Sequence, residues 1–392
     1  MNCRERILKA LDHEEPDKVP YWEHLIEQPK LVKLLDFKPI KGSELKLNSN
    51  LIKIPDFKKK TLKNYGYDPI VIKPLLNGAQ DYFKLYIKLK VDMSTYNIGP
   101  YSNFQFIAPD KAISPFGQIF QLKLHKDYLD IYYIGGNFNK ENYEEQFSKI
   151  NTEEPLITPL FGKVIQNVPE EQIYIIPGIF SGLFQSILEG FGIETFSRLI
   201  TKEKEFMKRV IKDRENLFIN IMKQNIDIFE RIAFFIGDDL AFNTGPFVSP
   251  RIFNEMFLPS YKRLSNIAHK RGIKLIFHSD GDIRPLLDGL IECFDAIHPW
   301  QASAHIDIIE IKRQYGDKVC IMGNVPVAML IHNKPREISI YVKNLLKECA
   351  PSGGYFMSSG NSIVPQIPIR NYMAMLRTFW RYRKYPIKVP SF

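Results

Sequence analysis

Two short groups of polar residues carry the clearest chemical signal in this sequence. Asp238 and Asp239 follow one short apolar run, and His278 and Asp280 follow a second one further along the chain. Apolar runs of this length are typical of buried strands. In a (β/α) barrel the loops after the strands meet at one mouth, so acids and a histidine in these positions predict an active site. Two carboxylates near one substrate allow one to bind a cation or proton while the other stays ionised. The pattern therefore predicts an enzyme.

The second half of the chain alternates short apolar runs with helical segments. The runs that we predict as strands are 174–176, 233–236, 275–277, 296–297, 319–322 and 355–357, with earlier candidates at 70–72 and 93–96. The best marked helix begins at Ser249-Pro250 and ends near Gly272, and Pro259 is expected to kink it. Strands that alternate with helices form a parallel sheet, so the predicted fold class is α/β, a (β/α)8 TIM barrel.

Polar residues also follow the later predicted strands. Gln301, Asn324 and Asn361 each come shortly after one of them, and we predict that they bind substrate through polar contacts. These strand ends can share one mouth only if the sheet closes. His298 is a weaker candidate, because the Pro-Trp pair that follows it could fix it as a packing element.

Each candidate also has a structural interpretation. An aspartate after a strand commonly hydrogen-bonds local backbone, so Asp238 or Asp239 could cap the following turn. An isolated histidine is more often structural, but the nearby Asp280 favours a site role for His278. Trp22 could form an aromatic wall for a planar or quaternary-ammonium ligand, or it could be buried under the N-terminal segment.

Composition limits the class of protein. An apolar share of 45% with 13% aromatic residues in 392 residues is enough for a large core. The longest apolar runs are too short to span a bilayer, and the first residues lack the apolar stretch of a signal peptide. Four scattered cysteines fit reduced thiols, so we expect a cytoplasmic protein without a membrane segment. The net charge of +9 can attract anionic partners, but no nucleic-acid-binding signature accompanies it, and we expect no nucleic acid.

Three regions are expected along the chain. We predict that residues 1–68 form an N-terminal extension packed on the barrel and that residues 69–392 form the barrel itself. Within the barrel, three β-rich runs between about 103 and 135 are separated by turn residues and predict a small antiparallel insertion.

Several segments together resemble the uroporphyrinogen decarboxylase superfamily. The likeness rests on Gly237-Asp238-Asp239-Leu240, His278-Ser279-Asp280-Gly281, Ile297-His298-Pro299-Trp300-Gln301, Gly323-Asn324, residues 353–375 and the opening segment 4–20. It covers most of the chain and is weakest from 31 to 169. The resemblance implies a (β/α)8 barrel and one of two chemistries, which are decarboxylation of a tetrapyrrole and methyl transfer with a corrinoid cofactor or its carrier protein.

The resemblance favours methyl transfer. The decarboxylases hold a polyanionic tetrapyrrole with arginines of an N-terminal motif, whereas this chain has Tyr21-Trp22-Glu23-His24 there and no arginine between Arg6 and Arg198. A substrate with many carboxylates needs guanidinium or ammonium groups to replace its hydration, and Glu23 would repel it. Trp22 and Glu23 are instead expected at the substrate site of a methyltransferase.

The methyltransferase branch also implies a metal site. Its zinc-dependent members use a His-x-Cys pair and a further Cys, and the matching positions here are His278, Asp280 and Asn361. Such a set could hold a harder divalent cation or a mixed zinc site, or it could bind a polar substrate directly. The predicted protein is thus a methyltransferase in which Asp238 and Asp239 orient a small-molecule substrate or move a proton, with a small corrinoid protein docked at the mouth. A tetrapyrrole decarboxylase, with Asp238 or Asp239 on the pyrrole N–H groups, and a non-catalytic corrinoid- or tetrapyrrole-binding barrel remain the alternatives.

Overall fold

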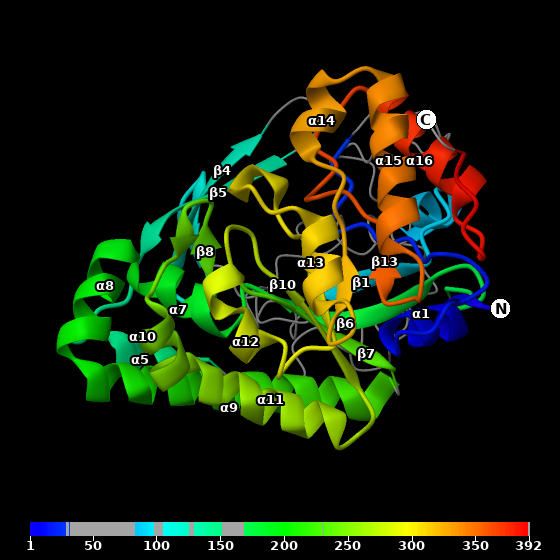
Figure 1. The fold of residues 1–392 in the computed structure, drawn as a ribbon. Helices are drawn as coiled ribbons and strands as arrows, with labels where there is room; N and C mark the ends of the chain where they lie inside the picture. The colour runs from blue at the N-terminus through cyan, green and yellow to red at the C-terminus, as the bar shows by residue number, and fades with distance from the viewer. Residues whose placement is uncertain are drawn as a thin grey trace, which may run out of the picture.

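The structure of the protein is a computed structural model (Figure 1). It describes residues 1–28, 31, 83–97, 105–124, 129–150, 168–229 and 231–390. The strand predicted at 70–72 and the domain boundary predicted between 68 and 69 lie outside the described residues. No helix in these described ranges is both long and apolar enough to cross a membrane.

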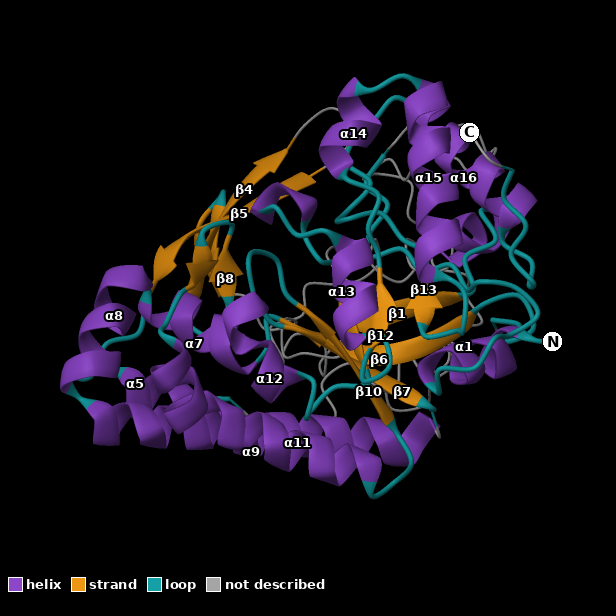
Figure 2. Cartoon of the chain, viewed as in Figure 1, coloured by secondary structure: helices purple, strands orange, loops and turns teal. Residues whose placement is uncertain are grey.

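Seven parallel strands form the central sheet (Figure 2). In order across the sheet they are β1 (Met93–Asn97), β6 (Tyr174–Phe180), β7 (Ala233–Gly237), β10 (Lys274–His278), β11 (Ala296–His298), β12 (Cys320–Met322) and β13 (Tyr355–Phe356). These strands confirm the predicted runs that lie within the described residues. The parallel sheet and its helical connections confirm the predicted α/β barrel class.

The N-terminal segment lies between the two edge strands of this sheet. Tyr21 forms a parallel bridge with Met357, just after β13, and Trp22 forms one with Met93 in β1. The Met357 N–H donates to the Pro20 carbonyl at 3.0 Å, and the Trp22 N–H donates to the Met357 carbonyl at 3.0 Å. Residues 20–22 therefore take the eighth position, and the sheet closes as a barrel. Residues 20–22 lie within the region predicted as an N-terminal extension, and they form part of the barrel wall.

Helices cover the outside of the barrel (Figure 1). They are α1 (Cys3–Leu11), α5 (Tyr143–Phe147), α7 (Leu183–Phe191), α8 (Ile193–Lys202), α9 (Lys204–Phe229), α10 (Pro250–Ile252), α11 (Leu258–His269), α12 (Leu287–Leu290), α13 (Ile308–Tyr315), α14 (Val327–His332), α15 (Pro335–Cys349) and α16 (Ile369–Tyr382). Along β7, Phe235 belongs to the core inside the barrel, whereas Phe234 and Ile236 belong to the core between the barrel and its helices. This is the alternation that a closed sheet requires.

The helix predicted from Ser249 to Gly272 is interrupted. The Ser249 hydroxyl caps α10 by accepting the Ile252 N–H at 3.3 Å, and a π-helical turn at Phe253–Phe257 separates α10 from α11. Pro259 lies in the first turn of α11, where its missing N–H costs least. The π-helical turn thus lies just before the proline at which a kink was predicted.

A second sheet stands beside the barrel. Its strands are β2 (Gln105–Ala108), β3 (Lys111–Ile113), β4 (Gln118–Leu124) and β5 (Leu129–Gly136), in that order and all antiparallel. It packs against α7, and the Phe138 N–H after β5 donates to the Gly190 carbonyl at 2.8 Å. A two-stranded hairpin of β8 (Ala241–Phe242) and β9 (Gly245–Pro246) follows β7. The β-rich runs predicted near 103–135 are therefore strands of an antiparallel sheet.

The two ends of the chain meet at one buried carboxylate. Asp92, which precedes β1, is 3% exposed. It accepts hydrogen bonds from Nη1 of Arg6 at 2.7 Å, from Nη1 of Arg383 at 2.8 Å and from the Tyr21 N–H at 2.8 Å. The Arg6 and Arg383 side chains are themselves 4% and 6% exposed. The carboxylate thus joins α1, the barrel-closing segment and the residue after α16.

We expect Asp92→Ala to destabilise the protein by about 3–5 kcal/mol, because it leaves two buried guanidinium groups without this counter-charge. Urea unfolding of the variant and the parent measures the loss. Asp317→Ala is the matched control, since Asp317 lies in an exposed turn before β12. A loss of under about 1 kcal/mol for Asp92→Ala, as for an ordinary surface substitution, would contradict this account of barrel closure.

Candidate functional site

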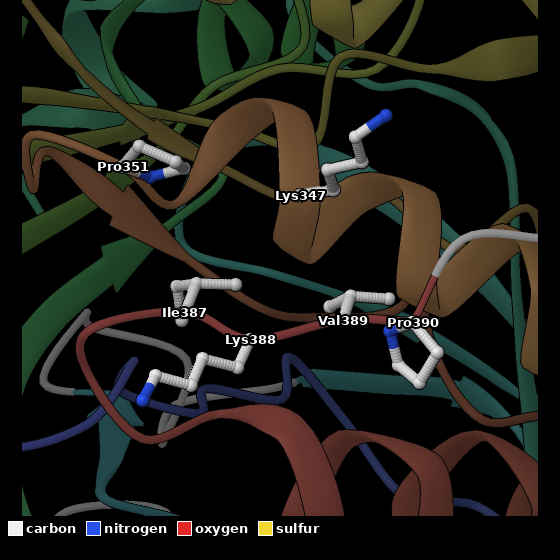
Figure 3. A pocket seen from close by; sticks show the side chains of 6 residues that line it. All are labelled: Lys347, Pro351, Ile387, Lys388, Val389 and Pro390. Carbon is white, nitrogen blue, oxygen red and sulfur yellow. The ribbon is translucent and has the colours of Figure 1, made fainter.

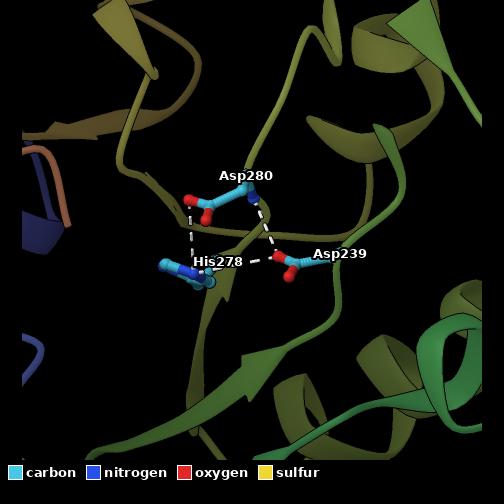
Figure 4. Close-up of side chains that lie close together, drawn as sticks. All are labelled: Asp239, His278 and Asp280. Carbon is cyan, nitrogen blue, oxygen red and sulfur yellow. Dashed lines mark hydrogen bonds and ion pairs between the residues drawn. The ribbon is translucent and has the colours of Figure 1, made fainter. Parts of the chain in front are cut away.

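Three side chains meet where β7 and β10 end (Figure 4). His278 Nε2 lies 3.9 Å from Asp239 Oδ1 and 3.8 Å from Asp280 Oδ1. The parallel register places Gly237 opposite His278, which brings the two following loops together, and the Asp280 N–H donates to Asp239 Oδ1 at 2.9 Å. The His278 side chain is 8% exposed, whereas those of Asp239 and Asp280 are 34% and 31% exposed. The cluster therefore opens toward solvent on its acidic side.

His298 supports His278 from below the cluster. The register between β10 and β11 pairs the two residues, and their Nδ1 atoms are 2.7 Å apart. His298 Nε2 donates to the Ser359 carbonyl at 3.2 Å. His298 is fully buried, and this burial, with the neighbouring His278 and His24, lowers its pKa well below the ordinary value. His298 is therefore neutral. The sequence had ranked it below the other candidates.

His24 is a site residue that the sequence did not single out. Its ring stacks on His278 with centroids 4.6 Å apart and planes 8° apart, and Phe180 lies on another side at 5.4 Å. Burial and the nearby His278 lower the pKa of His24 well below its ordinary value. Its Nδ1 is buried and finds no hydrogen-bond partner among the described residues. The only sequence signal was its place two residues after Trp22, which had no assigned strand.

Asn361 and Gln301 hold the loop that carries Asp280. Asn361 Nδ2 donates to Asp280 Oδ2 at 2.7 Å, and its oxygen accepts the Ser362 N–H at 2.7 Å. Gln301 Oε1 accepts the Gly281 N–H at 2.5 Å. The amide oxygen of Asn361 thus accepts a backbone hydrogen bond next to the cluster. Asp239 lies in reach of His278 and Asp280 and adds a carboxylate to the predicted set, whose binding of a metal stays a prediction.

Asp280 lies in a largely desolvated environment. Desolvation is the largest influence on its pKa and raises it, and the nearby Asp239 raises it further, while His278 and the hydrogen bond from Asn361 lower it. Its Oδ1 is buried and accepts no hydrogen bond from any residue that the structure describes. A cation or a proton donor at this oxygen would satisfy it.

Asp238 faces away from this cluster. It is fully buried and accepts the Gln185 N–H at 2.6 Å, the Phe184 N–H at 3.0 Å and the Tyr261 hydroxyl at 2.5 Å. Its carboxylate therefore caps the first turn of α7. These contacts are those expected of a structural Asp238, and of the two adjacent acids Asp239 is the one that belongs to the cluster. The catalytic role predicted for Asp238 stays a prediction.

Three predicted substrate-binding residues are also fully buried. Asn324 donates to the Trp300 carbonyl at 2.5 Å and accepts the Tyr341 hydroxyl at 3.0 Å, so both ends of its amide are used. Trp22 belongs to the core inside the barrel, with its ring edge-on to His298 at 4.5 Å. Asn324 and Trp22 thus contact other parts of the protein, and the substrate roles predicted for them stay predictions.

Glu23 is held beneath the mouth. It accepts the Tyr21 hydroxyl at 2.5 Å, the Ser359 N–H at 3.3 Å and the Ser359 hydroxyl. Burial raises the pKa of Glu23 to about 7, although these hydrogen bonds oppose the rise. Because its oxygens already accept these donors, Glu23 anchors Ser359, and the contact with substrate predicted for Glu23 stays a prediction.

A separate hollow lies elsewhere, away from the cluster (Figure 3). It measures about 590 Å³ and is lined by Lys347, Pro351, Ile387, Lys388, Val389 and Pro390. Pro351 lies between the end of α15 and the start of β13, and therefore at the opposite end of the barrel from the cluster. This hollow contains no acid or histidine, and the candidate site remains the cluster at the mouth.

Comparisons with known proteins agree with this geometry. The family model described as "Uroporphyrinogen decarboxylase (URO-D)" matches residues 179–382. Uroporphyrinogen decarboxylase of Coxiella burnetii (strain RSA 493 / Nine Mile phase I) is 34% identical over 70 residues, which are 18% of this chain and 19% of that protein. Uroporphyrinogen decarboxylase of Chlamydia muridarum (strain MoPn / Nigg) is 31% identical over 84 residues, 21% of this chain and 24% of that protein. The matches thus span less than a quarter of either relative.

A solved structure matches over nearly the whole chain. It is described as a methyltransferase from Methanosarcina mazei, and it has a TM-score of 0.68 at 14% identity, covering 97% of this chain and 99% of that one. At this identity the likeness supports the fold alone.

Asp238 gives a testable pH dependence. Burial raises its pKa from 3.8 to about 7, so between these values the folded protein binds a proton that the unfolded chain has lost. Its contribution to stability is therefore full below the lower value and falls as the pH rises to about 7. We expect Asp238→Asn, which keeps an acceptor for a backbone N–H, to flatten this fall in urea-unfolding measurements across that range. The exposed Asp317→Asn serves as control, and an unchanged slope in Asp238→Asn would contradict the assignment.

Proposed function

Because the chain belongs to the uroporphyrinogen decarboxylase family, we propose that it is a methyltransferase of that family that uses a divalent cation and a corrinoid carried by a small partner protein. The observation that carries the proposal is the cluster of Asp239, His278 and Asp280 at the barrel mouth. One imidazole nitrogen and two carboxylates, in reach of one another and open on one side, are the ligands of a cation site that keeps positions for substrate.

The residues present fit a divalent cation. The buried Oδ1 of Asp280 accepts no hydrogen bond from the described part of the chain, and the ligand atoms of the three residues lie within 4.8 Å of one another. The oxygen-rich set suits a harder cation than a site with two thiolates, or zinc bound more weakly. When bound, such a cation would supply Lewis-acid chemistry that favours the deprotonated form of the methyl acceptor.

The protein's own residues hold and orient this site. Asn361 and Gln301 fix the Asp280 loop by the hydrogen bonds described above, and His24 stacks along one face of His278. Asp239 is the most exposed of the three ligands. It is placed to accept the proton that the methyl acceptor loses.

A tetrapyrrole decarboxylase is the weaker alternative. Its substrate carries several carboxylates, and the cluster presents two carboxylates to it, neither of which is paired with a guanidinium group of the described residues. Arg6, the last arginine before Arg198, lies at Asp92 and Asp17, beside the start of β1 at the other end of the barrel. The names of the curated relatives are the support for this alternative, and they rest on short matches.

Metal analysis together with a cobalamin assay tests the proposal. We expect the purified protein to take up a divalent cation that chelators remove readily. With a thiol supplied as methyl acceptor, we expect the visible spectrum of methylcobalamin to change as its methyl group passes to the thiolate sulfur and cob(I)alamin remains. We expect negligible conversion of uroporphyrinogen. Efficient conversion, with no spectral change of methylcobalamin, would overturn the ranking in favour of the decarboxylase.

The cluster itself can be tested by paired variants. Asp239→Asn removes one charged ligand, and we expect a loss of about tenfold or more in cation affinity by calorimetry, with matching loss of activity. Asp282→Asn is the control, because Asp282 is a nearby acid paired with Arg284 and lies outside the cluster. Equal affinities in the two variants would show that the cation is not bound at Asp239.

A further inference from the structure

We propose that His298 is a positioning residue that fixes the tautomer of His278, so that the lone pair of His278 Nε2 faces Asp239 and Asp280. The role in cation binding rests on the proposed function, whereas the tautomer itself follows from the hydrogen bonds alone. The two can therefore fail separately.

The assignment starts at the Ser359 carbonyl. A carbonyl oxygen only accepts hydrogen bonds, so His298 Nε2, at 3.2 Å, must carry a proton. A neutral imidazole has one N–H and one lone pair, and His298 Nδ1 is then an acceptor. His278 Nδ1 is 2.7 Å away and must therefore be the donor. In neutral His278 the remaining nitrogen, Nε2, has the lone pair.

The surroundings of the two rings differ. His298 is fully buried, its Nε2 contacts a backbone carbonyl, and the Trp22 ring stands roughly perpendicular to its own. His278 Nε2, in contrast, has two carboxylates within 4 Å. A cation is therefore stabilised at the cluster and not at the fully buried His298, which has no carboxylate of the described residues against it.

The Ser359 carbonyl, which accepts the last hydrogen bond in the series from His278 through His298, is itself held in place. Ser359, which supplies the carbonyl, is bound through both its N–H and its hydroxyl to the buried Glu23. Glu23 is held in turn by Tyr21 of the barrel-closing segment, and the Tyr21 hydroxyl contacts the Tyr372 hydroxyl at 2.7 Å. The orientation of His298 is thus tied to the wall of the barrel. This is the arrangement by which outer residues orient a metal-binding histidine.

Three substitutions separate positioning from packing. His298→Asn places an amide oxygen near the original Nδ1 and so retains the acceptor for His278. His298→Gln reaches toward Ser359 but offers little at the Nδ1 position, and His298→Leu removes both groups. If His298 only fills space, Gln and Leu, whose volumes are closer to that of histidine, should be tolerated better than the smaller Asn. If it positions His278, Asn should be tolerated best.

Nitrogen-15 NMR of the histidine rings in the cation-free full-length protein reads the tautomer directly. Where His278 is neutral, we expect its proton on Nδ1 in the parent and in His298→Asn, and a mixture of tautomers in His298→Gln and His298→Leu. The His278 signals are assigned by their loss in His278→Gln. A parent in which the His278 proton resides on Nε2 would overturn the proposal, whatever the protein's activity.

Calorimetric titration with Zn²⁺ gives the second readout, with thermal unfolding as the check that each variant is folded. We expect His298→Leu and His298→Gln to lose about 10–100-fold in affinity, the range for outer residues of metal sites, and His298→Asn to lose much less. Equal losses in all three variants would refute positioning by the acceptor. If the parent binds no Zn²⁺ but shows the Nδ1 proton, the tautomer inference stands and the proposed metal dependence fails.

Discussion

The barrel depends on the segment that fills the position between its two edge strands, β13 and β1. Residues 20–22 hydrogen-bond to β1 on one side and to the end of β13 on the other, and the buried carboxylate of Asp92 holds Tyr21 while it neutralises Arg6 and Arg383. This closure places the next two residues under and at the mouth. Glu23 then anchors Ser359, and His24 stacks on His278. A charge network at one end of the barrel thereby sets the geometry of the cluster at the other.

The register of the parallel strands also determines which site residues lie next to one another. Gly237, His278 and His298 lie in one row across β7, β10 and β11, so residues far apart in the chain become neighbours by pairing alone. Asp239 and Asp280 each follow a residue of that row by two positions. Because register is common to a whole strand, a single substitution near the mouth cannot easily shift it, and the cluster is a rigid feature of the sheet.

This explains which parts of the site could be predicted from the sequence. That acids and a histidine end two buried strands is visible locally, and the parallel strands and the antiparallel runs near 103–135 follow from local patterns. The direction of each side chain is not local. Asp238 and Asp239 are adjacent, yet one caps α7 and the other joins the cluster. The barrel-closing pairing of Trp22 is with residues from both halves of the chain, so neither that strand nor the role of His24 had a sequence signature.

The balance of charge at the mouth decides what the site can accept. Three histidine rings lie together, and burial lowers the pKa of His24 and of His298 well below the ordinary value, so that neither neutralises an acid. A cation bound between Asp239 and Asp280 would neutralise these two acids. The two carboxylates at the mouth attract a cation and disfavour a polyanionic substrate. In the proposed cation site one imidazole and two carboxylates form a harder ligand set than one that contains thiolates, and this hardness, more than the fold, would decide which cation the mouth accepts.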